Sequence, residues 1–356
     1  MSPRTVLWWG RFDPEYSRNR ILRKAFDALG WESRAFRPVI SALGAVEADL
    51  RRLSTPGLVF VPCFRQRDIA CARRYSHARG VPLLIDPLIS AYDKQVFERA
   101  KFPEQSPQAR RLLNWERGLL QSADSVLADT SEHAHFFHEI LGVPESKLHV
   151  VPVGAEEVLF TPAPHAPNDP LVVLFFGSFL ALQGPEVIVE AARRYRGPTV
   201  RWRLIGRGPW LADCRKRAAG LDNVEFLDWL PYAQLPTAIQ HADIVLGVFG
   251  TTPKADRVIP NKVYQALACG KPLITRRASA YPDELTSASG NGISWIEAGD
   301  APALARAVQQ LAEQGDRLAA VGAQARASYE RFFSTERIVA ELDTALRETL
   351  IQSSRG

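Results

Sequence analysis

The sequence predicts an α/β protein built from two doubly wound, Rossmann-like parallel sheets, one in each half of the chain. Three observations lead to this fold class: the length of 356 residues, the alternation of short apolar runs with longer amphipathic stretches, and a proline-rich interruption near the middle. The length exceeds what one ordinary hydrophobic core accommodates, and two domains account for it. Apolar runs separated by helical stretches are typical of βαβ units, whose parallel strands are buried on both faces.

The first half contains the runs expected for one such sheet. Helical patterns, such as Asn19–Ala28 and Leu112–Gln121, lie between them. The stretch Thr161–Pro170 then carries four prolines in ten residues, which fits neither a helix interior nor a central strand and predicts a linker. The predicted strands of this half are Thr5–Trp9, Leu58–Pro62, Pro82–Ile85, Ser125–Ala128 and His149–Val153.

The second half repeats the pattern and ends in a long amphipathic stretch. Apolar residues recur at helical spacing over Thr335–Gln352, which predicts a terminal helix that packs back onto the first half. The expected division is therefore 1–163, a linker at 164–170, a second domain at 171–334 and the terminal helix at 335–356. The predicted strands are Leu171–Phe176, Arg201–Ile205, Val224–Leu227, Ile244–Val248, Pro272–Thr275 and Ile293–Ile296.

Composition and charge restrict the classes of partner. The net charge of +5 favours anionic ligands such as nucleotides, nucleic acid or a membrane surface. No recognition helix or RNA-binding motif is visible, so we do not expect nucleic-acid binding. Neither a long apolar segment nor a signal peptide is evident, so we expect a cytoplasmic protein. The four cysteines are scattered without a Cys-x-x-Cys pair, and we expect no metal and no cofactor.

Two glycine loops in the second half are candidate nucleotide contacts, because parallel α/β sheets bind ligands beyond the carboxyl ends of their strands. The first, from Phe176 to Pro185, contains Gly177, Ser178 and Gln183 and leads into a helix that begins at a proline. The second contains Gly206 and Arg207. A tight structural turn is the alternative for each loop.

The segment Lys254–Pro272 is the most informative of the chain. Asn261 can begin a helix that Gly270 and Pro272 end. The cations Lys254, Arg257 and Lys262 gather at its amino-terminal end, where a helix dipole normally favours acidic side chains. We interpret them as groups that neutralise a bound anion; solvated surface charges are the alternative.

The order and spacing of these motifs resemble the family-4 glycosyltransferases, retaining enzymes of the GT-B fold. The resemblance covers nearly the whole chain and is strongest from Leu171 to Asp300. It rests on the two glycine loops, on Asn223–Phe226, and on the helix with the segment Ala266-Leu267-Ala268-Cys269-Gly270-Lys271-Pro272. It implies metal-independent transfer of a sugar from a nucleotide-sugar to a glycan, lipid-linked or small-molecule acceptor in a cleft between the halves.

The resemblance also implies roles for individual residues. Asp86 and Lys262 are the expected catalytic residues, together with Arg257, which is expected for its charge in the cation cluster; a turn-forming role is the alternative for Asp86. The acceptor is expected at loops of the first half. The expected donor-binding residues are Gly177, Ser178, Gln183, Gly206, Arg207, Lys254, Asn261 and Gln265, and the expected acceptor-binding residues are Gly10, Arg11, Asp13 and Asp93. Five arginines of the first half could further form a basic face that contacts an anionic membrane at its inner side, and an ordinary soluble basic helix is the alternative: Arg65, Arg67, Arg73, Arg74 and Arg79.

The chain departs from the family pattern at four positions. Arg257 and Gln265 occupy the places of two glutamates that usually contact the donor sugar and the ribose, and Ser178 and Gln183 replace the usual Arg and Lys. Gln265 can still hydrogen-bond a ribose hydroxyl. A nucleotide-sugar epimerase or hydrolase on the same fold, and a non-catalytic nucleotide-sugar binder, are therefore the alternative functions.

Overall fold

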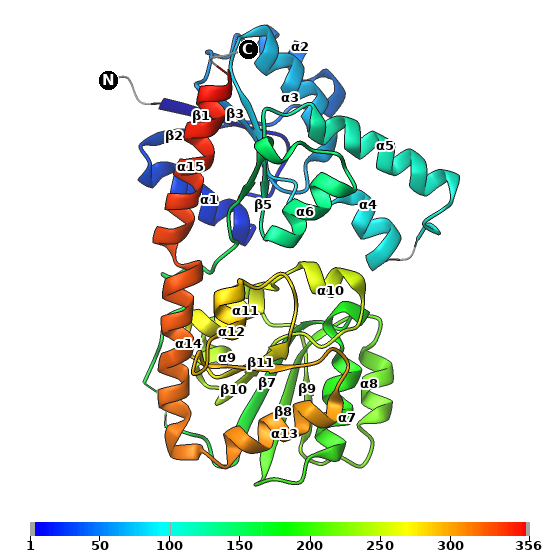
Figure 1. Cartoon of the computed structure of the whole chain (residues 1–356), viewed down its shortest axis with the longest axis vertical. Coiled ribbons are helices and arrows are strands. Elements are labelled where there is room, and N and C mark those ends of the chain that lie inside the picture. Colours follow the sequence, from blue (N-terminus) through cyan, green and yellow to red (C-terminus); the bar gives the residue numbers. More distant parts are fainter. Residues whose placement is uncertain (1–3, 100, 165, 354–356) are drawn as a thin grey trace. The chain divides into compact units, whose positions relative to one another are not determined.

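The computed structural model describes residues 4–99, 101–164 and 166–353, in two compact units (Figure 1). One unit consists of Met1–Val153 and Thr335–Gly356, and the other of Gly154–Ser334. The boundary thus lies ten residues before the end that the sequence predicts for the first domain. The proline-rich stretch belongs to the second unit, where the Gln240 amide donates to the carbonyl of Thr161 at 2.8 Å and the Asn168 amide binds Asp243 at 2.7 Å.

The first unit is built on a six-stranded parallel sheet in the order β2-β1-β3-β4-β5-β6. The sequence reading missed β2, because its residues WESRAF are polar and mostly exposed at the sheet edge, so the run is not continuously apolar. The strands are β1 (Arg4–Trp9), β2 (Trp31–Phe36), β3 (Leu58–Val61), β4 (Leu83–Ile85), β5 (Ser125–Ala128) and β6 (Leu148–Val150).

Helices cover both faces of this sheet. The terminal helix α15 packs against α1, and its Ile338 and Leu342 share a buried cluster with Leu22 and Phe26. The C-terminal segment thereby completes the core of the first unit, although its last three residues lie outside the described part of the chain. The helices of this unit are α1 (Ser17–Ala28), α2 (Gly44–Leu50), α3 (Gln66–Ala78), α4 (Ala91–Asp93), α5 (Pro107–Gln121), α6 (Ser131–Glu139) and α15 (Thr335–Ser353).

The second unit is a six-stranded parallel sheet in the order β12-β11-β10-β7-β8-β9. All six strands of this half were predicted, because each contains a short run with several apolar residues. β10 and β11 are fully buried and β7 nearly so, whereas β8 alternates buried and exposed residues and β9 and β12, at the sheet edges, are half-buried. Its strands are β7 (Leu171–Ser178), β8 (Val200–Arg207), β9 (Val224–Leu227), β10 (Ile244–Leu246), β11 (Leu273–Arg276) and β12 (Ile293–Ile296). Two doubly wound parallel sheets therefore confirm the predicted fold class.

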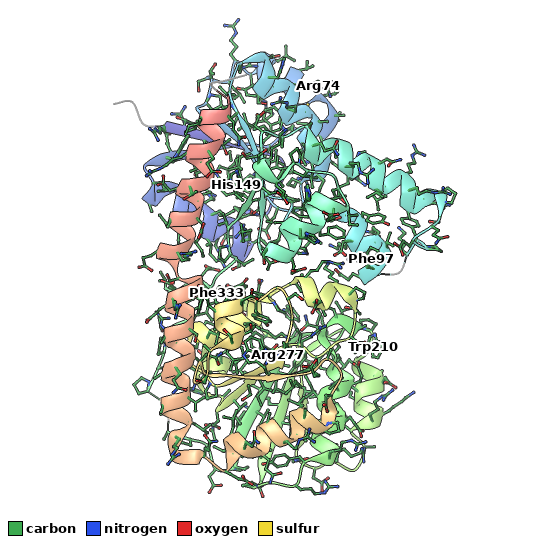
Figure 2. The ribbon with its side chains drawn as sticks, viewed as in Figure 1. Arg74, Phe97, His149, Trp210, Arg277 and Phe333 are labelled. Atoms are coloured by element: carbon green, nitrogen blue, oxygen red, sulfur yellow. The ribbon has the colours of Figure 1, made fainter. Side chains whose placement is uncertain are left out.

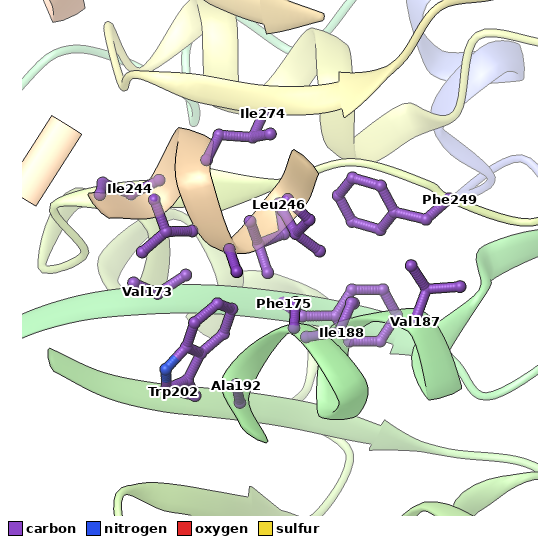
Figure 3. Packing of buried hydrophobic residues seen from close by; sticks show 14 of the residues in the cluster. Val173, Phe175, Val187, Ile188, Ala192, Trp202, Ile244, Leu246, Phe249 and Ile274 are labelled. Atoms are coloured by element: carbon purple, nitrogen blue, oxygen red, sulfur yellow. The ribbon is translucent and has the colours of Figure 1, made fainter. Parts of the chain in front are cut away.

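Helices on both faces close the second core. Figure 3 shows Phe175, Trp202 and Leu246 from three strands packed against Ile188 of α7, all of them buried. This rigid layer fixes the loops at the carboxyl ends of β7 and β8. The helices are α7 (Pro185–Arg194), α8 (Leu211–Arg217), α9 (Leu235–Gln240), α10 (Pro253–Arg257), α11 (Asn261–Ala268), α12 (Asp283–Ser287), α13 (Ala301–Ala312) and α14 (Leu318–Phe333).

None of the helices in the described ranges is both long enough and apolar enough to cross a bilayer.

Candidate functional site

The two predicted glycine loops lie side by side at the carboxyl ends of β7 and β8. Gly177 and Gly206 are partners in the strand register and have φ angles of 140° and 149°, a region that favours glycine. A Cβ atom on Gly206 would collide with the carbonyl oxygen of Gly177. Only glycine fits at position 206, and the absence of side chains lets a ligand approach the backbone closely.

The loop after β7 is fixed by backbone contacts. Gly184 has a φ of 63°, and a Cβ atom there would lie 2.6 Å from the amide nitrogen of Gly250. The amide of Phe249 donates to the carbonyl of Gln183 at 3.0 Å. The loops that follow β7 and β10 are therefore in contact, and together they hold the start of α7 beside the start of α10.

Lys262 is the central cation of this edge. It lies in the first turn of α11, is only 5% exposed, and its Nζ donates to Oε1 of Gln183 at 2.6 Å. The ammonium also lies 3.7 Å from the ring centroid of Phe175. A Cβ atom on Gly177 would be 3.2 Å from Nζ, so the lysine tip faces the glycine loop directly.

Burial lowers the pKa of Lys262 well below its usual range. Among the described residues, no carboxylate forms an ion pair with Lys262. Its hydrogen-bond partner, the side chain of Gln183, is neutral, so the positive charge of the ammonium is not compensated. An uncompensated buried cation is costly. The arrangement suits an anion that arrives at the carboxyl edge of the sheet.

The same helix brings two further predicted residues to this edge. Asn261 is its first residue and is partly exposed. Gln265 follows Lys262 by almost one turn and is 4% exposed, and within the described structure its side-chain amide makes no hydrogen bond. A buried amide with unused donors and acceptors can bind hydroxyl groups of a ligand.

The short helix α10 supplies the remaining predicted cations. Lys254 is buried and Arg257 is half-buried. Asp256, between them, does not face a free site: its carboxylate accepts from Nη2 of Arg276 at 2.9 Å and from Oγ of Ser279 at 2.9 Å. Arg276, the last residue of β11, was missed by sequence reasoning, although its place at the end of a strand was the signal that could have identified it.

Ser178 and Arg207, at the ends of β7 and β8, are register partners. The Arg207 guanidinium lies 5.1 Å from the ring centroid of Trp229, and the side chain is exposed. Among the predicted donor residues, the contacts therefore join Gly177, Gly206, Gln183 and Lys262 into one group, while Arg207 lies on the outer side with Trp229.

The carboxyl edge of the first unit carries a buried ion pair. Nε of Arg18 lies 2.9 Å from Oδ2 of Asp86, and both side chains are fully buried. Nη1 of Arg18 also donates to the carbonyl of Pro152 at 2.5 Å. Burial alone would lower the pKa of Arg18. The negative charge of Asp86, its hydrogen bond to Arg18 and the negative charge of the nearby Asp129 have the larger effect, so the pKa of Arg18 is raised.

This environment changes the interpretation of Asp86. The sequence places it at the end of a strand, where the structure also has it, directly after β4. Its carboxylate is enclosed and paired with Arg18 rather than open to solvent. A direct contact between Asp86 and an acceptor stays a prediction, and it would require the enclosing loops to open.

A second buried pair lies on the neighbouring strand. Asp129 directly follows β5, and its carboxylate contacts Nδ1 of His133 in the first turn of α6. The buried Asp–His pair was missed, although the position of Asp129 directly after a strand, like that of Asp86, was available as a signal. Within the described ranges no three His, Cys, Asp or Glu side chains are grouped to hold a metal ion.

The four predicted acceptor residues are separated. Gly10 is buried with a φ of 121°, and a Cβ atom there would lie 2.8 Å from Oδ2 of Asp68, so this glycine is required by packing. Arg11 and Asp13 are exposed, and Oδ1 of Asp13 accepts from the amide of Glu15 at 2.9 Å. Asp93 is buried, with its amide bound by Oγ of Ser90 at 3.1 Å.

A cavity of about 330 Å³ opens on the first unit between the loop after β3 and the segment from Ala91 to Trp115, and the four predicted acceptor residues are not in its lining. It is lined by cations and exposed aromatic rings, among them Arg67, Lys101, Phe64 and Trp115. Phe64 has a φ of 63°, which is rare outside glycine and is often found at binding sites. A larger cavity, of about 720 Å³, lies beside Lys271 and α14, at the amino ends of β10 and β11 and away from the glycine loops.

The expected basic face on α3 is largely neutralised. Arg73 pairs with Asp124 at 2.8 Å, Arg79 pairs with Asp49 at 2.5 Å, and Arg65 pairs with Asp68. Arg67 and Arg74 are exposed. The five arginines therefore do not form one free cationic surface.

Two family models match the chain, one in each unit. Residues 10–154 match the "Glycosyl transferase 4-like domain", and residues 170–314 match "Glycosyl transferases group 1". Together they cover the second sheet, every strand of the first sheet except β1, and both glycine loops. The chain belongs to the family-4 glycosyltransferases. Its two Rossmann-like units are those of the GT-B fold, as the resemblance implied.

Curated relatives of this family member are named D-inositol 3-phosphate glycosyltransferase. The one from Stackebrandtia nassauensis is 26% identical over 254 residues, covering 64% of this chain and 55% of the relative. The one from Kribbella flavida is 27% identical over 212 residues, covering 53% and 47%. The chain thus matches about half the length of these relatives.

Solved structures share the fold of this family member. HepE of Anabaena, solved with UDP, has a TM-score of 0.70 at 16% identity, covering 96% of this chain and 99% of that chain. Sucrose-phosphate synthase of Thermosynechococcus elongatus has a TM-score of 0.71 at 18% identity, covering 97% and 99%. At these identities the likeness establishes the fold.

Proposed function

We propose that the protein transfers a sugar from a nucleotide-sugar donor to a hydroxyl group of a glycan, lipid-linked or small-molecule acceptor, with retained anomeric configuration and without a metal ion. The observation that carries the proposal is Lys262, a buried cation that faces Gly177 and has no carboxylate among its described partners. Family membership supplies the reaction class, and the UDP complex of HepE supports the class of donor.

The donor would bind the second unit with its diphosphate against the glycine loops. Gly177 and Gly206 let the backbone approach the phosphates, and the ammonium of Lys262 neutralises charge on the β-phosphate. Lys254 and Arg257 of α10 add positive potential. Gln265 would bind the ribose hydroxyls with its unused amide. Asn261, Ser178 and Gln183 would complete the donor contacts, with Arg207 at the outer rim of the site.

The chemical step follows from this placement of charge. The bond between the anomeric carbon and the phosphate oxygen breaks, and negative charge develops on the leaving diphosphate. The acceptor oxygen forms the new bond on the same face, and its proton passes to the leaving phosphate oxygen. Lys262 contributes because fixed cations that stabilise the developing charge lower the barrier.

The acceptor would bind the first unit, near the loops of Gly10, Arg11, Asp13 and Asp93. The cavity with Arg67 and Lys101 favours an acceptor that carries a phosphate or carboxylate. The relatives are named for an inositol phosphate, which is an acceptor of this chemical class. Phe64 and Trp115 offer flat apolar surfaces to the ring of such a molecule.

The experiment that tests the function is a transfer assay with a panel of UDP-, GDP- and ADP-sugars and phosphorylated or free sugar acceptors. We expect one nucleotide-sugar to be consumed in the presence of an acceptor, and proton NMR of the product to show the anomeric configuration of the donor. Consumption without an acceptor would support the hydrolase or epimerase alternative. Binding without any turnover would support the non-catalytic binder.

Transfer should also survive chelation. Because Lys262 and its neighbouring cations neutralise the diphosphate in this proposal, we expect the initial rate in EDTA to be within about twofold of the untreated rate, far less than the roughly tenfold or greater loss expected when a charge-stabilising group is removed. The measurement is an initial rate with and without EDTA on protein purified without added metal. A complete loss that manganese or magnesium restores would contradict metal independence.

A further inference from the structure

The first unit exposes a continuous strip of large apolar side chains before and along α2. Soluble surfaces seldom concentrate apolar residues in this way unless they meet a partner. We call this surface the apolar strip. It consists of Val39, Ile40, Leu43, Val46 and Leu50, which are 65%, 53%, 54%, 58% and 79% exposed.

The five residues form one surface rather than scattered positions. Leu43, Val46 and Leu50 are spaced by three and four residues, which places them on one side of a helix. The amide of Val39 donates to Oε2 of Glu47 at 2.8 Å, so the segment before the helix lies beside that face. The opposite side of α2 is already used, because Ala48 packs in the core with Ala72 of α3.

Exposed arginines lie close to the apolar strip. Arg37 precedes the strip by two residues in the chain, with its guanidinium 5.3 Å from the ring centroid of Phe12, and Arg52 follows it by two residues. Arg37, Arg52 and Arg74 are exposed, and none of them forms an ion pair with another described residue. Arg74 lies next to the strip, since its Nη2 is 3.4 Å from the carbonyl of Ala42; Figure 2 labels it in the first unit. Arg51 and Arg79 compensate the two nearby acids, Glu47 and Asp49. The rim is therefore positive.

We propose that the apolar strip and its arginine rim dock the protein onto the surface of an anionic phospholipid bilayer. Apolar side chains would enter the boundary between headgroups and acyl chains, and the three unpaired arginines would face lipid phosphates. This deepens the proposed function, because it places the protein where a lipid-linked acceptor is carried. A second copy of the chain fits less well, since a symmetric contact would oppose two identical positive rims.

The test is flotation of the full chain with vesicles of phosphatidylglycerol and phosphatidylcholine, and with vesicles of phosphatidylcholine alone. We expect binding only to the anionic vesicles, weaker in high salt. Leu50→Ser should weaken binding about tenfold, and Val46→Ser with Leu50→Ser about a hundredfold, because each removes an inserting aliphatic group. Val158→Ser is the matched control: Val158 is also 79% exposed but lies in the second unit.

Each result of the flotation experiment either supports membrane docking or overturns it. Equal vesicle binding by the double variant and the Val158→Ser control, or no binding by the unchanged protein, would overturn it. A dimer in sedimentation equilibrium that Leu50→Ser dissociates would assign the strip to a second copy and would also overturn it. The UDP-induced thermal shift should be the same in all these variants, so failure of docking is distinguishable from failure of the proposed glycosyl transfer.

Discussion

Replacing Lys262 with Met is expected to weaken UDP binding roughly 10- to 100-fold, which corresponds to about 1.5–3 kcal/mol for a charge-assisted hydrogen bond. The side chain keeps its length and its packing on Phe175 but loses the charge that faces Gly177. The transfer rate should fall further than binding, because charge on the diphosphate grows in the transition state. Titration calorimetry with UDP and steady-state kinetics measure the two effects.

Although Lys262→Met should bind UDP more weakly, we expect the variant without UDP to be at least as stable as the unchanged protein. Removing a buried cation that lacks a carboxylate partner among the described residues relieves an unfavourable burial, so Lys262→Met should unfold at equal or higher denaturant concentration. Lys271→Met is the matched control, because Lys271 is also buried but lies two residues before β11, at the opposite edge of the sheet. Equal losses of UDP affinity in both variants would show that Lys262 has only a structural role.

Lys262 also predicts a dependence of stability on pH. Burial lowers its pKa in the folded state, so above that pKa the unfolded chain binds a proton that the folded chain does not. Stability therefore rises with pH between the folded pKa and the ordinary lysine pKa of about 10.4. Urea unfolding across this range should show the rise in the unchanged protein and a smaller one in Lys262→Met. Identical profiles would contradict this.

Replacing Asp86 with Asn is expected to destabilise the first unit by about 3–5 kcal/mol, because it leaves the guanidinium of Arg18 buried beside a neutral amide. The expected readout is a large drop in the urea midpoint of the transition that reports this unit. UDP affinity should be unchanged at temperatures where both units are folded, since the donor residues lie in the second unit.

The double variant Arg18→Met with Asp86→Leu separates a structural role from a catalytic one. Removing both charges should restore most of the stability, because no buried ion is then left unpaired. If Asp86 also orients the acceptor, the double variant should be stable but slow in transfer, with little change in donor binding. Normal stability of Asp86→Asn would mean that the Arg18 contact contributes little.

Most of the fold could be predicted from local sequence. Continuous apolar runs such as Leu171–Phe176 and Ser125–Ala128 identify strands buried on both faces, because no other strand environment tolerates them. The polar edge strand β2 could not be identified in this way, since only its ends, Trp31 and Phe36, are buried. The position of the unit boundary was also not predicted, because Gly154 marks it with a single glycine, whereas the later stretch Thr161–Pro170 carries four prolines and is the stronger linker signal.

The donor site was only partly accessible to sequence reasoning. Gly177, Gly206 and Lys262 were expected there as separate motifs, because glycine loops after strands and cations at a helix start are local patterns. That Lys262 contacts Gln183 and faces Gly177 depends on residues far apart in the chain. The hydrogen bond that Arg276 donates to Asp256 could not be predicted for the same reason.

The sequence by itself determined the fold class, the family and the elements that carry the candidate site, since these follow from periodicity and from short motifs. Only the tertiary structure decided which polar groups are enclosed. Asp86 could be placed after a strand, but its pairing with Arg18, 68 residues away, depends on how α1 packs on the sheet. The apolar strip could likewise be read as a helix face, but whether that face is buried or exposed depends on the neighbours that the folded chain places against it.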